Sequence, residues 1–230
     1  MTRGVACDND YASHPSTALQ FTCAVVRPSV GQPSDKGSMV SYCSAGSGDE
    51  AKAFKVVFVR KAVDNDQVIE HIGDFCGPAD WQGFLPGQQV LLKVDEVVRL
   101  VNARLHSAGH AIDAAMQRCG IFSQLKATKG YHFSDGPYVE YQGSISEAQL
   151  ATLPVDLNNE MQRIIRESIP TTVELMDNAS AGSVCGCDTS SYPPRVRVVS
   201  LAGVSIPCGG TDRCCCCCYC CIPCLMTLIA

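Results

Sequence analysis

The first residues of the chain lack the apolar segment that a secretory signal requires. They contain one basic residue, Arg3, and no hydrophobic stretch follows it, so we expect no signal peptide and a cytoplasmic location. Thiols stay reduced in such a compartment. We therefore expect most of the scattered cysteines to be small core residues rather than a disulfide framework: Cys7, Cys23, Cys43, Cys76 and Cys119.

An excess of positive charge is also missing. The chain has 18 Lys and Arg residues against 23 Asp and Glu residues, a net charge of -5. Composition therefore gives no overall case for nucleic-acid binding, which would have to depend on a local basic groove. With 230 residues, the chain is long enough to bury the core of one large domain or two modest ones.

The two halves of the sequence differ in pattern, and together they predict an α+β protein. Residues 1–93 contain short β-branched runs between Gly, Pro and Asp breakers, which is typical of a small β-barrel or sandwich. The runs are QFTCAVV, KAFKVVFVRKAV, QVIEHIG and QQVLLKV. Residues 94–211 predict helices over an antiparallel sheet, and residues 212–230 form a Cys-rich low-complexity tail.

A long helix is predicted to follow Asp95, its expected N-cap, and to end at Gly120. Apolar residues recur with helical spacing at Val94, Val98, Val101, Leu105, Ala108, Ile112 and Ala115. After the helix we expect a strand–turn–strand in GYHFSDGPYVEYQG, a second helix in SEAQLATLPVDLNNEMQRIIRES, and strands in TTVELMD and RVRVVSLAG. The segment NASAGSVCGCDTSSYPP is expected to be a flexible loop or insertion.

Two histidines four residues apart, His106 and His110, lie on this helix. Residues at i and i+4 project from one face, so both imidazoles can reach one ion. They point away from the apolar stripe and share their face with the small residues Ala103, Ser107 and Ala114. A solvated face that carries two histidines by chance is the alternative interpretation.

A tetrahedral zinc site needs further ligands, and a thiolate is a natural third. Cys208 is the best candidate, because it follows a predicted strand and precedes two glycines that permit a tight turn. Cys185 and Cys187 are a weaker alternative. A peptidase of the HExxH type is disfavoured, because Ser107 stands where its general-base glutamate would be.

Three segments in order, RLHSAGHAIDAAM, KGYHFSDGPYVEYQG and PCGGT, resemble the alanyl-tRNA editing proteins. These are freestanding relatives of the editing region of alanyl-tRNA synthetase. The segment GQPSDKG resembles the glycine-rich loop of the small β-barrel that precedes the editing domain in that family. The resemblance covers about residues 20–211 and implies a zinc-dependent hydrolase that removes serine or glycine from mischarged alanine tRNA.

The resemblance also implies roles for individual residues. His106, His110 and Cys208 correspond to zinc ligands, and Asp212 stands where the family has a fourth, histidine ligand. Residues expected at the substrate are Gln32, Asp35, Gly209, Gly210 and Thr211, with Thr22 as a further candidate, whereas no catalytic base is identified. Asp113 and His132 are possible helpers in the zinc-dependent step, with a structural hydrogen-bonding role as the alternative. Lys126 and Lys129 are expected to contact tRNA phosphates, with Arg163, Arg166, Arg195 and Arg197 as further basic candidates.

A catalytically inactive tRNA-binding or regulatory homologue is the alternative, since Asp212 alters the ligand set. No stretch is long enough for an ATP-binding synthetase core, so ATP is not an expected partner. The tail after Arg213 is short for a bilayer span, and we expect no stable membrane partner. Lipidated cysteines or a metal cluster are other interpretations of the tail, but we expect it to be unstructured and foreign to the family fold. Sequencing the transcript across residues 211–213 tests this expectation.

Overall fold

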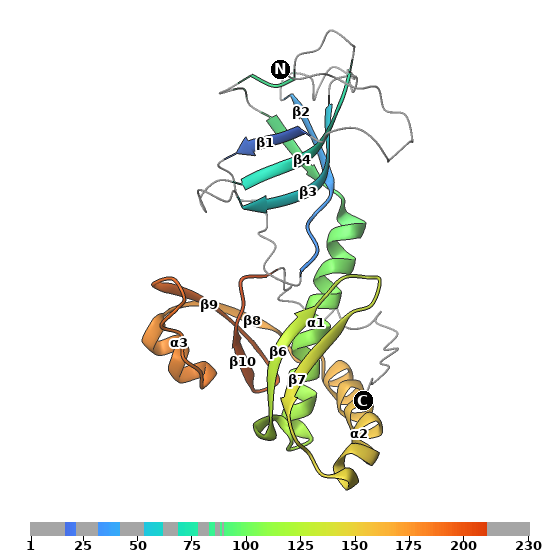
Figure 1. Cartoon of the computed structure of the whole chain (residues 1–230), viewed down its shortest axis with the longest axis vertical. Coiled ribbons are helices and arrows are strands. Elements are labelled where there is room, and N and C mark those ends of the chain that lie inside the picture. Colours follow the sequence, from blue (N-terminus) through green and yellow to red (C-terminus); the bar gives the residue numbers. More distant parts are fainter. Residues whose placement is uncertain are drawn as a thin grey trace. The chain divides into compact units, whose positions relative to one another are not determined.

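A computed structural model describes residues 17–21, 32–41, 53–61, 69–77, 83–85, 88 and 90–210. Residues 1–28 and 34–100 form one compact unit, and residues 29–33 and 101–230 form the other. The trace in Figure 1 follows the chain through both units. Helices and antiparallel sheets occur together, so the α+β class is confirmed.

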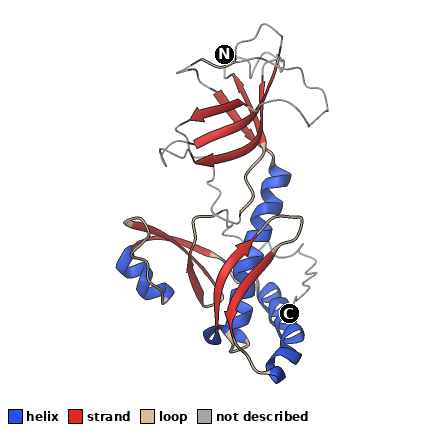
Figure 2. Ribbon diagram, viewed as in Figure 1, coloured by secondary structure: helices blue, strands red, loops and turns tan. Residues whose placement is uncertain are grey.

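The N-terminal unit contains a five-stranded antiparallel sheet in the order β1-β4-β3-β2-β5. Figure 2 shows these strands in red. Their bounds are Thr17–Phe21 for β1, Gly37–Ser41 for β2, Ala53–Lys61 for β3, Ile69–Cys76 for β4 and Val90–Val94 for β5. No pairing joins the outer strands β1 and β5 in the described part of the chain, so a closed barrel is not found there.

Buried and more exposed side chains alternate along β4, and the buried ones contribute to a hydrophobic core on one face of the sheet. In β4 every second side chain is buried, which is the period expected when one face of a sheet is covered. In the described part of this unit, six buried hydrophobic side chains form one core cluster: Met39, Phe54, Val56, Val59, Ile69 and Phe75. Strands β3, β4 and β5 lie within or across the predicted runs. The sequence pattern missed β2, whose five residues directly follow a Pro- and Asp-containing segment.

Helix α1, Glu96–Arg118, begins as predicted. The carboxylate of Asp95 accepts a hydrogen bond from Val98 N at 3.0 Å, which satisfies one of the unpaired N–H groups of the first turn. The burial of its faces differs from the prediction. Ala103, His106 and Ser107 are almost completely buried, whereas Val101 on the apolar stripe is 38% exposed. Small side chains let neighbouring segments approach the helix closely, and this decides which face is covered.

The second unit adds two sheets and two further helices to α1. A 3₁₀ turn, Phe122–Gln124, leads into the hairpin of β6, Leu125–Tyr131, and β7, Tyr138–Gly143. Helix α2, Glu147–Glu167, follows and starts with a capping box at Ser146. Strands β8, Thr172–Asp177, β9, Arg195–Leu201, and β10, Val204–Pro207, form an antiparallel sheet in the order β10-β9-β8. The single sheet expected from the sequence is therefore two separate sheets.

The segment expected to be a loop between β8 and β9 begins with helix α3, Asn178–Cys185, so that prediction was wrong for these residues. Asp177 caps the helix by accepting a hydrogen bond from Ser180 N at 2.9 Å. Ala181 is fully buried against Val196 and Val198 of β9, and Gly186 ends the helix in the left-handed conformation. The Gly- and Ser-rich composition concealed these local signals.

The main core of the second unit lies between α1, α2 and the β9–β10 hairpin. Ala111, Ala114, Ala115 and Met116 of α1 belong to the same cluster as Leu153, Leu157, Met161 and Ile164 of α2 and Leu201 and Val204 of the hairpin. Burying one such large side chain stabilises the fold by about 1.5–3 kcal/mol. This packing fixes α1 and the hairpin that leads to Cys208. Among the described helices, none combines the length and apolarity needed to cross a membrane.

Candidate metal site

The site is built on the buried face of α1. His106 and His110 lie one turn apart, and their rings stack with centroids 5.0 Å apart and an interplanar angle of 27°. His106 is 2% exposed and His110 is partly buried. The interpretation of this face as a solvated surface is therefore wrong.

Strand β10 brings Cys208 to these histidines. The β9–β10 hairpin turns at Ala202 and Gly203, both with positive φ, and continues through Pro207 to Cys208. Arg197 of β9 holds the backbone of Cys208 on both sides: its carbonyl accepts from Cys208 N at 2.9 Å, and its Nη1 donates to Cys208 O at 2.8 Å. The Cys208 Sγ then lies 3.1 Å from His106 Nε2.

The three side chains predicted as ligands thus converge, although His106 and Cys208 are 102 residues apart in the chain. One potential ligand atom from each lies within 4.8 Å of the others. Atoms bound to one ion must be neighbours at about this spacing, so the group could hold a metal ion. Two imidazoles and a thiolate form a donor set that suits Zn²⁺, whose sites are commonly built from Cys and His.

Gln32 and Gly210 close around His106. Gln32 is 8% exposed, and its Nε2 lies 3.2 Å from His106 Nε2. Its Oε1 is buried with no hydrogen-bond partner within the described ranges, so an acceptor is available beside the candidate ligands. A Cβ on Gly210 would overlap both the His106 ring and the Gln32 amide, so this position requires glycine. Gly209, by contrast, has open space where a Cβ would be.

Asp113 lies one turn beyond His110 and is 6% exposed. Burial raises the pKa of its carboxyl group, while the hydrogen bond from the Tyr141 hydroxyl and the nearby charge of His110 lower it. Burial and the Asp113 carboxylate also raise the pKa of Tyr141. No sequence pattern connects Tyr141 with Asp113, because Tyr141 comes from β7, 28 residues away along the chain.

The hairpin β6–β7 carries three further candidates. Lys126 and Lys129 are exposed, and Lys129 Nζ lies 5.6 Å from the centroid of the Tyr138 ring. A hydrogen bond with Tyr138 raises the pKa of Lys129. His132 stacks on His106, with ring centroids 4.7 Å apart and an interplanar angle of 14°. His106 is therefore in contact with a ring from its own helix and a ring from the hairpin.

Asp35 belongs to the N-terminal unit and pairs there with Arg99. Its carboxylate is 4% exposed and accepts two hydrogen bonds from the guanidinium, one of them from Nε at 2.6 Å. This pair joins the segment before β2 to the first turns of α1. Thr22, Gly31, Thr211, Asp212 and the Cys-rich tail lie outside the described residues.

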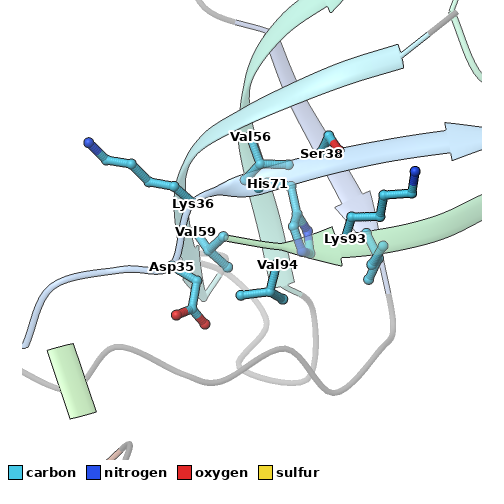
Figure 3. A pocket seen from close by; sticks show the side chains of 10 residues that line it. Asp35, Lys36, Ser38, Val56, Val59, His71, Lys93 and Val94 are labelled. Carbon is cyan, nitrogen blue, oxygen red and sulfur yellow. The ribbon is translucent and has the colours of Figure 1, made fainter. Parts of the chain in front are cut away.

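The N-terminal unit also contains a small cavity, shown in Figure 3. Its volume is about 20 Å³, which is room for roughly one water molecule. Val56, Val59 and His71 are among the residues that line it. Burial lowers the pKa of His71, so this histidine is held neutral. The cavity is too small for an aminoacyl group.

The remaining rival ligands lie apart from the group of His106, His110 and Cys208. Cys185 and Cys187 are at the end of α3, where Cys187 N donates to Gly182 O at 3.3 Å. Cys119 packs against the main core, as expected for a small core residue.

No protein-family model matches the chain.

Proposed function

We propose that the protein is a zinc-dependent hydrolase that removes serine or glycine from mischarged alanine tRNA. The observation that carries the proposal is the convergence of His106, His110 and Cys208, with ligand atoms within 4.8 Å of one another. The motif resemblance supplies the substrate class, and the geometry gives these motifs a common site. A zinc ion bound there would polarise the ester or lower the pKa of an attacking water.

The residues around the group have separate tasks in this proposal. Gln32 offers its unpartnered Oε1 to a donor on the substrate, such as the ammonium group of the attached amino acid. Gly209 and Gly210 carry no side chains that would block the approach of the aminoacyl end. Thr211, Asp212 as a fourth ligand and Asp35 as a pocket residue remain predictions from the resemblance.

The tRNA contacts are proposed for the exposed hairpin. Lys126 and Lys129 of β6 are exposed, and the hairpin that contains them also carries His132, which stacks on His106. Phosphate contacts of this kind position a nucleic acid without reading its sequence. The finer assignment of the N-terminal unit, as the small β-barrel that accompanies this editing domain, is part of the same proposal.

Such an activity has a physical reason. A synthetase pocket for alanine cannot strongly reject glycine, which is smaller, or serine, which only adds a hydroxyl group. A second, hydrolytic site separates these amino acids after attachment. The proposed protein would supply this site in trans.

The test is hydrolysis of Ser-tRNA(Ala) and Gly-tRNA(Ala) by the full-length chain, with Ala-tRNA(Ala) as the control substrate. We expect hydrolysis of the mischarged species, loss of activity after treatment with a chelator, and recovery when zinc is restored. Unchanged hydrolysis after complete removal of the metal would contradict the proposed chemistry.

One observation favours a second candidate function, a catalytically inactive tRNA-binding or regulatory homologue. Asp212 replaces the histidine that the family has at the fourth ligand position. This candidate predicts binding of alanine tRNA without hydrolysis of its ester. Failure of zinc to bind His106 and His110 after refolding in the presence of the metal would favour it.

A further inference from the structure

The His132 ring stacks on His106 and does not belong to the group of His106, His110 and Cys208. The two rings are close to parallel, at 14°, with centroids 4.7 Å apart, and His110 stacks on His106 at 5.0 Å. Offset stacking at such distances is attractive. The orientation of a ligating imidazole is usually fixed by groups outside the ligand set. His106 has to keep its Nε2 directed at Cys208, which lies 3.1 Å away.

Two glycines make room for the His132 ring, and they come from different elements. A Cβ on Gly109 of α1 would lie 2.6 Å from His132 Cε1, and a Cβ on Gly130 of β6 would lie 2.7 Å from His132 Nε2. Such distances are too short for unbonded atoms, so any side chain at either position would displace the imidazole. The edge of the ring that carries its nitrogens is therefore enclosed by the backbones of α1 and β6.

We infer that His132 is a positioning residue: its ring, seated between Gly109 and Gly130, holds the His106 imidazole in the orientation that binds the metal. His132 itself does not contribute a ligand atom to the group of His106, His110 and Cys208. The inference rests on the metal site of the proposed function but not on its reaction. It also explains why a strand residue, Gly130, and a helix residue, Gly109, both lack side chains.

The test is zinc affinity at the histidines in the full-length chain. The protein contains five histidines, so selective ¹⁵N labelling gives a small set of ring signals. A competing chelator fixes the free zinc concentration, and the signals of His106 and His110 then report the occupancy of this site alone. Thiols elsewhere in the chain do not affect this readout.

We expect His132→Ala to weaken zinc binding by about 10- to 100-fold, as is typical when a group outside the ligand set is removed. Gly130→Ala should weaken it by about 10-fold or more, because the added methyl group displaces the His132 ring although His132 and every ligand residue are unsubstituted. Gly136→Ala is the matched control, because a Cβ there meets no atom within 4 Å in the turn of the same hairpin. Gly109→Ala should also weaken binding, although alanine is the better helix former.

The double variant Gly130→Ala/His132→Ala decides how Gly130 acts. If it acts through the His132 ring, the double variant binds zinc no more weakly than His132→Ala alone, because the new methyl group fits the vacated space. Additive losses would contradict the inference, as would Gly130→Ala with wild-type affinity. A metal-bound shift of the His132 ring nitrogens would identify it as a ligand instead and overturn the positioning role.

Loss of thermal stability in His132→Ala without a change in zinc affinity would show that the ring only supports the hairpin, and would also overturn the inference. If zinc leaves the His106 and His110 signals of the wild-type chain unchanged, both the metal site and this inference fail. If zinc binds and the variants behave as expected but no mischarged tRNA is hydrolysed, only the proposed reaction fails.

Discussion

Among the described residues, each unit of the protein has one histidine that is almost completely buried, and the surroundings of these two histidines differ. His71 in the N-terminal sheet is 1% exposed and lines a small cavity together with aliphatic side chains that include Val56, Val59 and Leu92. His106 on α1 is 2% exposed, in contact with two imidazoles and a thiol. Burial alone therefore does not identify a functional histidine. The neighbours that burial brings to the ring distinguish the two.

Substitution of Gly210, which lies against the His106 ring, is expected to have the largest effect on the metal site. Gly210→Ala would place a methyl group inside the space of the His106 ring and the Gln32 amide. We expect zinc affinity at the histidines to fall by about 100-fold, since the ligand itself is displaced. Chelator competition measures the loss. Gly209→Ala, one residue earlier and with open space around it, should bind zinc within about 2-fold of wild type; equal losses in both variants would show that the loop tolerates no substitution at all.

Asp35 lines the same cavity as His71, and its pair with Arg99 tests whether this carboxylate stabilises the N-terminal unit. Asp35 is 4% exposed and Arg99 is 28% exposed. We expect Asp35→Asn to lower the free energy of unfolding of the N-terminal unit by about 1–3 kcal/mol, because it weakens a charged hydrogen-bonded pair at a buried position. The more exposed Arg60–Glu70 pair is the control, and Arg60→Gln should cost less than about 1 kcal/mol. If Asp35 acts only in the proposed substrate pocket, its substitution would instead leave stability nearly unchanged and impair hydrolysis.

His71 provides a smaller effect that depends on pH. Burial lowers its pKa in the folded state from the ordinary value of 6.5. Well above pH 6.5 the His71 side chain is neutral in both the folded and the unfolded state, and it does not change stability with pH. Below pH 6.5 the unfolded state takes up the proton first, so stability falls by up to about 1.4 kcal/mol per pH unit until the folded state is protonated too.

Denaturant unfolding of the wild type and His71→Leu between pH 5 and 8 measures this contribution as the difference between the two curves. The variant should lose the part of the acid sensitivity that comes from position 71, and its zinc affinity should be unchanged. Identical pH dependence in both proteins would show that His71 is not held neutral. A loss of zinc binding in His71→Leu would contradict the interpretation that His71 has a structural role and His106 binds the metal.

The ligand group could be predicted from the sequence because it depends on local rules. The i, i+4 spacing of His106 and His110 and the Pro-Cys-Gly-Gly context of Cys208 are visible in a linear chain, and the helix start at Asp95 follows from its capping chemistry. The burial of α1 was different. Its valines predicted the covered face, but Ala103, Ser107 and Gly109 allowed other segments to approach more closely than a valine surface would.

Contacts between segments that are distant in the chain could not be predicted from the sequence by such local rules. Nothing near Tyr141 indicates that its hydroxyl bonds to Asp113, and nothing near Arg197 indicates that it holds both backbone groups of Cys208. These contacts follow from the pairing of β6 with β7 and of β9 with β10. The helix α3 was missed for a different reason, since its stability comes from the Asp177 cap and one buried alanine rather than from an apolar stripe.

The central claim is that His106, His110 and Cys208 hold one zinc ion that the reaction requires. The most direct measurement compares wild type and His110→Ala for zinc occupancy at the His106 ring and for hydrolysis of Ser-tRNA(Ala). The account predicts that the substitution removes the zinc response of His106 and lowers hydrolysis by about 100-fold or more. Unchanged zinc occupancy and unchanged hydrolysis in His110→Ala would contradict it.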